Sequence, residues 1–101
     1  MLPAFNNPLK LAGEIAMLDA ISGGRADIGM ARAFLPHEFR RFGVGLDESR
    51  ERYDEGVAQI RALLAGENVS MDGKFHSFTD VTSLPRPTQQ PHPPIWVAAL
   101  Q

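Results

Sequence analysis

The feature that most constrains the fold is a run of uncharged residues, PIWVAAL, at positions 94–100. Apolar side chains occupy consecutive positions there, a pattern typical of a strand buried on both faces of a parallel sheet. A second stretch, Ala26 to Met30, alternates apolar and polar residues and predicts another short strand. Parallel strands need a long crossover connection, and a helical pattern lies between these two. The sequence therefore predicts a βαβ unit in a parallel α/β sheet.

A helix is predicted ahead of the first strand. Asn7 is a good N-cap, and Pro8 suits the first helical position because its missing N–H would be unpaired there. Gly23 and Gly24 predict a left-handed C-terminal stop. The residues of the predicted buried face are Leu11, Ile15 and Leu18, with Ala12 and Ala16 beside them.

The crossover helix is predicted to begin near residue 47 and to stop at Gly66. Asp47 is its predicted cap, and Glu48 and Glu51 place negative charge in the first turn, where the helix dipole favours it. Gly56 lies inside the helix, which predicts close packing at that position. The predicted buried stripe consists of Tyr53, Val57, Ile60 and Leu64.

Between the crossover helix and the last strand, the sequence predicts a hairpin and an irregular connection. Asp72–Gly73 is a strong two-residue hairpin signal within VSMDGKFHSF. The following SLPRPTQQPHPP carries five prolines and is predicted to be extended. About two strands are too few to bury the helices, so we expect the chain to be part of a larger barrel or sheet.

Composition excludes several classes of protein. A formal net charge of −2 gives no reason to expect nucleic acid as a partner, and no apolar run is long enough to cross a membrane. The chain has no cysteine, which excludes disulfides, thiol catalysis and cysteine zinc sites. Three histidines lack metal-ligand spacing. A cytoplasmic location is therefore expected.

Three segments together resemble the bacterial luciferase-like flavin monooxygenases: NPLKLAGEIAMLDAISGGRADIGMAR, FRRFGVGLDESRERYDEG and LPRPTQQPHPPIWVAA. They occur in the family's order and spacing and cover essentially the whole chain. The resemblance implies a (β/α)8 TIM barrel of which residues 1–101 form a central fragment of a single domain. By that resemblance the chain runs from the end of the third barrel strand to the fifth strand, with two helices and the hairpin and proline-rich excursion between them.

The resemblance also implies a cofactor site where the fourth barrel strand ends. From the residues alone, Arg32 either meets an anion or is a solvated surface charge. In the family the matching arginine lies beside flavin mononucleotide, and a guanidinium fork suits phosphate oxygens. Ala31 and Asn6 are the other predicted cofactor-binding residues, whereas Asn7 is interpreted first as the helix cap. Ala33 stands where many members have glycine. No catalytic residue and no metal ligand are assigned.

Other residues remain with alternatives open. His37 is interpreted as a loop histidine, with a substrate-facing role as the alternative. Trp96 packs in the core or lies against flavin or substrate. Arg86 and the prolines after it also match a ligand for proline-binding domains, although the family resemblance explains them as a barrel loop.

The function implied by the resemblance is a flavin-dependent oxidoreductase. It would use reduced FMN from a separate reductase, together with O2, to oxidise a small organic substrate. Relatives are often dimers, so a homodimer of the full-length enzyme is one alternative, and its oligomeric state is left open. One alternative is hydride transfer with coenzyme F420, which relatives on the same barrel use. Another is a non-catalytic truncated remnant, and the isolated fragment is expected to be inactive.

Overall fold

The computed structural model describes residues 1–32 and 36–97 and shows a parallel strand pair and an antiparallel hairpin. Strand β1 (Ile28–Met30) pairs in parallel with β4 (Ile95–Val97), with Ile28 opposite Ile95. Strand β2 (Val69–Asp72) pairs antiparallel with β3 (Ser77–Val81). The predicted crossover between two parallel strands is therefore confirmed.

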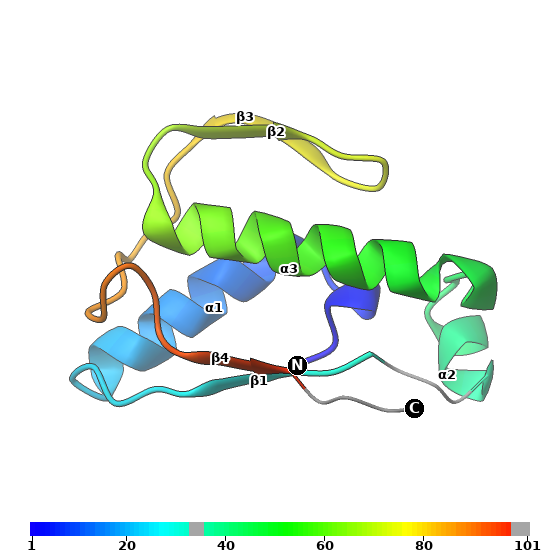
Figure 1. Ribbon diagram of the computed structural model, residues 1–101, viewed down its shortest axis with the longest axis horizontal. Coiled ribbons are helices and arrows are strands. Elements are labelled where there is room, and N and C mark those ends of the chain that lie inside the picture. Colours follow the sequence, from blue (N-terminus) through cyan, green and yellow to red (C-terminus); the bar gives the residue numbers. More distant parts are fainter. Residues whose placement is uncertain (33–35, 98–101) are drawn as a thin grey trace.

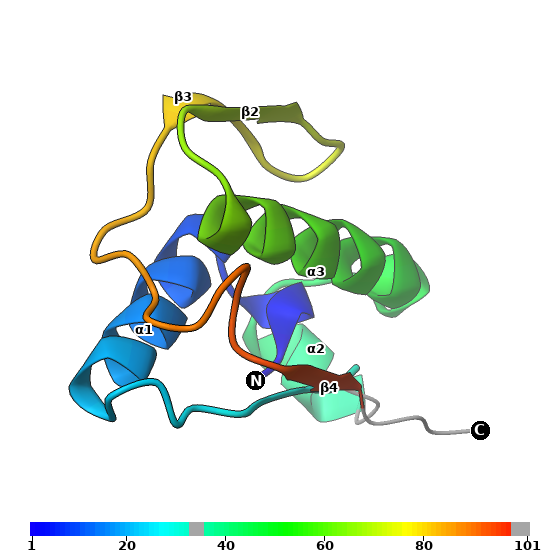
Figure 2. The same ribbon diagram turned by 60° about the vertical axis from the view of Figure 1, so that its left-hand side comes forward.

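Two of the three helices lie on one side of the parallel pair. The helices are α1 (Pro8–Ile21), α2 (Pro36–Arg41) and α3 (Ser49–Ala65), with short 3-10 turns η1 (Pro3–Phe5) and η2 (Leu46–Glu48). In Figures 1 and 2, α1 and α3 cover the same face of β1 and β4, and the β2–β3 hairpin lies on the far side of α3. The short α2 was not predicted, and it places His37 in a helix instead of a loop.

Both ends of α1 form as the sequence predicts. The Asn7 side-chain oxygen accepts a hydrogen bond from the Leu9 backbone N–H at 2.9 Å, and Pro8 is the first helical residue. Gly23 and Gly24 adopt φ values of 70° and 82°, which other residues rarely adopt. These local signals position the start of β1.

The core lies between α1, α3 and the strands. Its buried residues include Leu11, Ile15, Ile28, Met30, Ile60, Leu63, Leu64 and Phe78. Tyr53 and Val57 are partly buried against it, as predicted. Leu18 is 50% exposed, so its predicted burial is wrong. The core-facing position of that last turn belongs instead to Asp19, whose hydrogen bonds offset its burial.

Strand β4 is less buried than its apolar sequence predicts. Trp96 is 67% exposed and Val97 is also exposed, so neither is a core residue. The helices cover only one face of the pair, and within the described residues β1 is the only strand beside β4. The rest of the predicted strand, residues 98–100, lies outside the described part, as does Ala33.

The start of α3 differs from the prediction. Asp47 lies in η2, and the N-cap of α3 is Glu48, whose side chain makes no capping hydrogen bond. The helix ends at Gly66 as predicted. Gly56 is buried, and a Cβ atom there would lie 2.9 Å from the Cβ of Pro3, so the predicted close packing is confirmed.

The hairpin is held against α3 by two side chains one turn apart. The Glu55 carboxylate accepts backbone N–H groups of three consecutive residues, Lys74, Phe75 and His76. The amide nitrogen of Gln59 donates to the His76 carbonyl at 2.8 Å. The predicted hairpin is therefore confirmed, but its strands are joined by residues 73–76, so the prediction of a two-residue Asp72–Gly73 turn is wrong.

Arg86 closes the C-terminal end of α3. Its guanidinium donates to the carbonyl oxygens of Leu63 at 3.3 Å and Leu64 at 3.1 Å, which have no partner within the helix. A positive charge is favourable at this end of a helix dipole. The arginine beside the prolines thus anchors the connection that leads to β4.

Candidate functional site

The carboxyl ends of the parallel strands meet at one edge of the sheet. Because β1 and β4 run in the same direction, Met30 and Val97 end together. The Met1 amino group donates to the Gly29 carbonyl at 2.8 Å, and the Ala31 N–H donates to the Met1 carbonyl at 2.9 Å. The first residue therefore lies along β1, on the side away from β4, and Ala31 is fixed at the edge.

Arg32 follows Ala31 at this edge and is exposed. The positive charge of Arg32 acts on Tyr53, in the second turn of α3, a residue that the sequence predicted only as part of the buried stripe. The Tyr53 hydroxyl is buried and has no hydrogen-bond partner within the described residues. A buried tyrosine hydroxyl normally has one. In the sequence, the one signal that could have pointed to Tyr53 is a tyrosine in a predicted buried stripe, because its hydroxyl would need a hydrogen-bond partner there.

The environment keeps Tyr53 protonated. Burial raises its pKa above the ordinary value of 10.0, and the negative charge of Asp54 adds to this, whereas the positive charge of Arg32 opposes it. At neutral pH the phenol is therefore a hydrogen-bond donor, and Arg32 is a cation. An exposed cation at the carboxyl edge of parallel strands can bind an anion, and the Tyr53 O–H is a donor within reach of the same charge.

The two asparagines near this edge are both engaged in local structure. Asn7 caps α1, as described above. Asn6 donates from its side-chain nitrogen to the Leu2 carbonyl at 3.0 Å, which stabilises η1. Only the side-chain nitrogen of Asn6 is used in the described bonds, so its role toward a cofactor stays a prediction.

The histidines do not converge on one site. His37 lies on α2, His76 in the hairpin connection and His92 before β4. Across residues 1–32 and 36–97, no group of three metal-ligating side chains comes together. In the same residues, no helix combines the length and the apolar character needed to cross a membrane.

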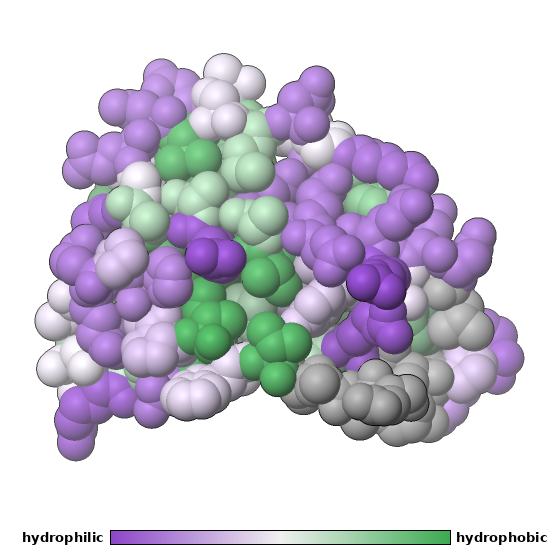
Figure 3. Space-filling model, in the orientation of Figure 1, coloured by the Kyte–Doolittle hydropathy of each residue, from purple (hydrophilic) through white to green (hydrophobic). Residues whose placement is uncertain are grey.

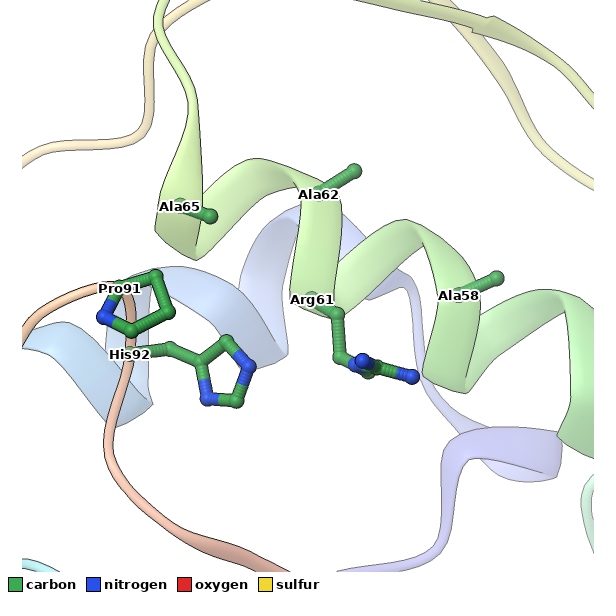
Figure 4. Close-up of a pocket in the computed structure, with 6 residues that line it drawn as sticks. All are labelled: Ala58, Arg61, Ala62, Ala65, Pro91 and His92. Carbon is green, nitrogen blue, oxygen red and sulfur yellow. The ribbon is translucent and has the colours of Figure 1, made fainter.

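A pocket lies toward the amino-terminal end of β4, separate from Arg32. It has a volume of about 360 Å³ and is lined by Ala58, Arg61, Ala62, Ala65, Pro91 and His92. Figure 4 shows Arg61 and His92 extending into the space between α3 and the proline-rich connection. Figure 3 shows apolar residues exposed across this face of the molecule. Because ligands of parallel α/β sheets bind outside the carboxyl ends of the strands, this pocket is not the candidate site.

A buried carboxylate holds together the end of the sheet opposite Arg32. Asp19 has no exposed surface, and its two oxygens accept the Gln89 backbone N–H at 2.8 Å and the Gln89 side-chain amide at 2.7 Å. It also accepts the Ala26 N–H at 3.4 Å. This cluster ties α1 to the beginnings of both β1 and β4.

Comparisons with known proteins agree with these observations. The family model described as luciferase-like monooxygenase matches residues 1–101. The oxygenase component of the flavin-dependent trigonelline monooxygenase of Acinetobacter baylyi is 46% identical over 97 residues, which are 94% of this chain and 27% of that protein. The FMNH2-dependent dimethylsulfone monooxygenase of Pseudomonas putida is 32% identical over 99 residues, covering 95% of this chain and 27% of that protein.

A solved structure shows the same arrangement. The monooxygenase RslO1 from Streptomyces bottropensis is 58% identical and superposes with a TM-score of 0.94, over 96% of this chain and 30% of that one. The chain thus spans between a quarter and a third of the length of these relatives. Its mixed α/β fold is consistent with part of a luciferase-like barrel. Because the family model covers every residue, this chain belongs to the luciferase-like monooxygenases, a family of flavin-dependent oxidoreductases.

Proposed function

We propose that this chain contributes a flavin phosphate site to a monooxygenase that uses reduced FMN and O2 to oxidise a small organic molecule. The observation that carries the proposal is the exposed Arg32 just beyond the carboxyl end of β1, whose charge acts on Tyr53, a residue with a buried and unpartnered hydroxyl. The names of two relatives, one flavin-dependent and one FMNH2-dependent, support the cofactor.

The residues present fit a phosphate. Arg32 presents several N–H donors that match phosphate oxygens in pairs, and the raised pKa of Tyr53 keeps its hydroxyl protonated as a further donor. The Ala31 backbone lies beside them at the strand end. Asn6 has its side-chain oxygen left for an N–H of the flavin ring, because the described bond uses its nitrogen.

Bound reduced flavin would supply the electrons that activate oxygen. The part of this chain is to bind and orient the cofactor. We further propose that residues 1–101 form one continuous part of a single barrel domain, from the end of its third strand to its fifth. A separate flavin reductase is proposed as the partner, since the Acinetobacter relative is named an oxygenase component.

Arg32→Ala in the intact protein is expected to weaken FMN binding by about 1.5–3 kcal/mol, or roughly 10- to 150-fold, because a charge-assisted bond is lost. Riboflavin lacks the phosphate, so its affinity should change less than about twofold. Tyr53→Phe should weaken FMN binding by about 0.5–1.5 kcal/mol and also spare riboflavin. Titration followed by flavin fluorescence measures all four affinities.

Arg25→Ala serves as the matched control, because it removes an exposed cation that precedes β1, at the end of the strand opposite Arg32. Its FMN affinity should equal that of the unchanged protein. Equal losses of FMN and riboflavin in Arg32→Ala would contradict a phosphate contact. Tight binding of coenzyme F420 with no binding of FMN would contradict the proposed function as a whole.

A further inference from the structure

The hairpin contains the only aspartate in the sequence that is followed by glycine, Asp72–Gly73. Such a pair can rearrange through its own backbone, because glycine has no side chain to keep its nitrogen away from the preceding carboxyl group. The Gly73 nitrogen bonds to the Asp72 Cγ atom, and one water molecule leaves with the amide hydrogen and a carboxyl oxygen. A second water then opens the five-membered ring at the main-chain carbonyl carbon of Asp72. The chain afterwards continues through the side chain, as isoaspartate.

Both reacting groups are engaged while the hairpin is closed. The Gly73 N–H donates to the His76 carbonyl at 3.1 Å, and the Asp72 carboxylate accepts the Ser77 hydroxyl at 2.8 Å. Asp72 is also the last residue of β2 and lies opposite Ser77 in the antiparallel pair. These bonds hold the nitrogen and the carboxylate on other partners, so ring closure requires the hairpin to open first.

Glu55 controls both the opening of the hairpin and the residue at position 73. Its carboxylate accepts the backbone N–H groups of residues 74–76, which directly follow Gly73, and we call these bonds the Glu55 clasp. A Cβ atom at Gly73 would collide with the same carboxylate, which could move aside only by giving up these bonds. The residue that closes the hairpin therefore also requires the glycine that makes Asp72 reactive.

We propose that Asp72–Gly73 is a site of isoaspartate formation, and that the Glu55 clasp sets its rate by keeping the hairpin closed. The modification takes place only in the opened hairpin, where the Gly73 nitrogen can reach Cγ. Isoaspartate lengthens the backbone by one carbon atom at the end of β2, so the former pairing with Ser77 is lost. The modified hairpin cannot close again as before. This inference does not rest on the proposed flavin site.

Glu55→Ala in the intact protein tests the clasp. During incubation at neutral pH, isoaspartate at position 72 should form roughly tenfold faster or more, because its rate follows the population of the opened hairpin. Peptide mapping with mass spectrometry measures the rate. Glu51→Gln is the matched control, since it removes only an exposed pair with Lys74, and its rate should stay within about twofold of the unchanged protein. Asp72→Glu should give no signal at this position, because its longer side chain would have to form a six-membered ring.

The intact protein unfolded in urea gives the rate of the open chain. The folded protein should form isoaspartate at position 72 at least about tenfold more slowly than the unfolded one. Equal rates in the two states would overturn the proposed protection, and no isoaspartate in urea would show that the pair is unreactive. Hydrogen exchange of the hairpin amides separates the last case. If Glu55→Ala accelerates this exchange but leaves the isoaspartate rate unchanged, the clasp opens the hairpin without controlling the modification, and the proposal is wrong.

Discussion

Asp19→Ala is expected to lower the melting temperature of the intact protein by roughly 10 °C, one of the two largest effects that we predict. The carboxylate is fully buried and accepts both the backbone and the side-chain N–H of Gln89. Alanine would leave these donors and the Ala26 N–H buried without an acceptor. Unsatisfied buried donors destabilise more than the net contribution of the bonds they lose. Thermal unfolding followed by circular dichroism measures the change.

Asp19 also contributes to the free energy of unfolding in a way that depends on pH, and this contribution is lost in acid. Burial raises the pKa of Asp19, but hydrogen bonds from Gln89, Ala26 and Thr88 outweigh it and hold the pKa below its ordinary value of 3.8. The unfolded chain therefore takes up a proton first as pH falls. The stabilisation is fully present above about pH 4 and is lost as pH falls through the lower value of the folded state.

Asp27→Ala is the matched control, since Asp27 is exposed and lies one residue after Ala26. It should leave the melting temperature within about 2 °C of the unchanged protein. Asp19→Asn keeps the shape of the side chain but removes its negative charge, so we expect this variant to be less stable at pH 7. It should also lack the contribution to stability that the unchanged protein loses in acid. An Asp19→Ala protein as stable as Asp27→Ala would contradict the role of this cluster.

Glu55→Ala is expected to destabilise the protein by about 2–4 kcal/mol, because three backbone N–H groups lose a charged acceptor. The loss should be local as well as global. Amide hydrogen exchange should accelerate first in the hairpin, at Lys74 to His76, whose backbone N–H groups donate to Glu55. Mass spectrometry of exchanged peptides resolves this region.

Glu51→Gln is the control for this prediction, one turn earlier on the same helix. It removes only the pair between Glu51 and Lys74, both of which are largely exposed. Exposed pairs contribute little to stability, so hairpin exchange should remain slow. If Glu51→Gln and Glu55→Ala accelerate exchange equally, the carboxylate of Glu55 does not hold the hairpin.

Local sequence signals predicted the elements whose ends are set by neighbouring residues. Asn7 and Gly23–Gly24 bound α1 as expected, because a cap and a left-handed turn act over a few positions. The parallel pairing of β1 and β4 also followed from apolar patterning and the helix between them. The Asp72–Gly73 turn failed because contacts from a distant residue, Glu55, decided the backbone there. Asp47 lies in η2 instead of capping α3, and nothing in the structure explains this difference.

The candidate site depended on contacts that no local pattern contains. Arg32 stood out because it follows a strand, but its neighbour Tyr53 is 21 positions later and looked like a core residue. Asp19 and Gln89 are separated by 70 positions, so their cluster was visible only in the folded chain. Trp96 does not pack in the core of the described residues, because burial of a strand depends on the layers that cover it, and its alternative position against flavin or substrate stays a prediction.

The most direct test of the central claim is a crystal structure of the intact protein with FMN. Our account predicts the phosphate within about 3.2 Å of both the Arg32 guanidinium and the Tyr53 hydroxyl, at the carboxyl ends of the strands. A phosphate bound elsewhere, with the Tyr53 hydroxyl hydrogen-bonded to the protein's own chain, would contradict it.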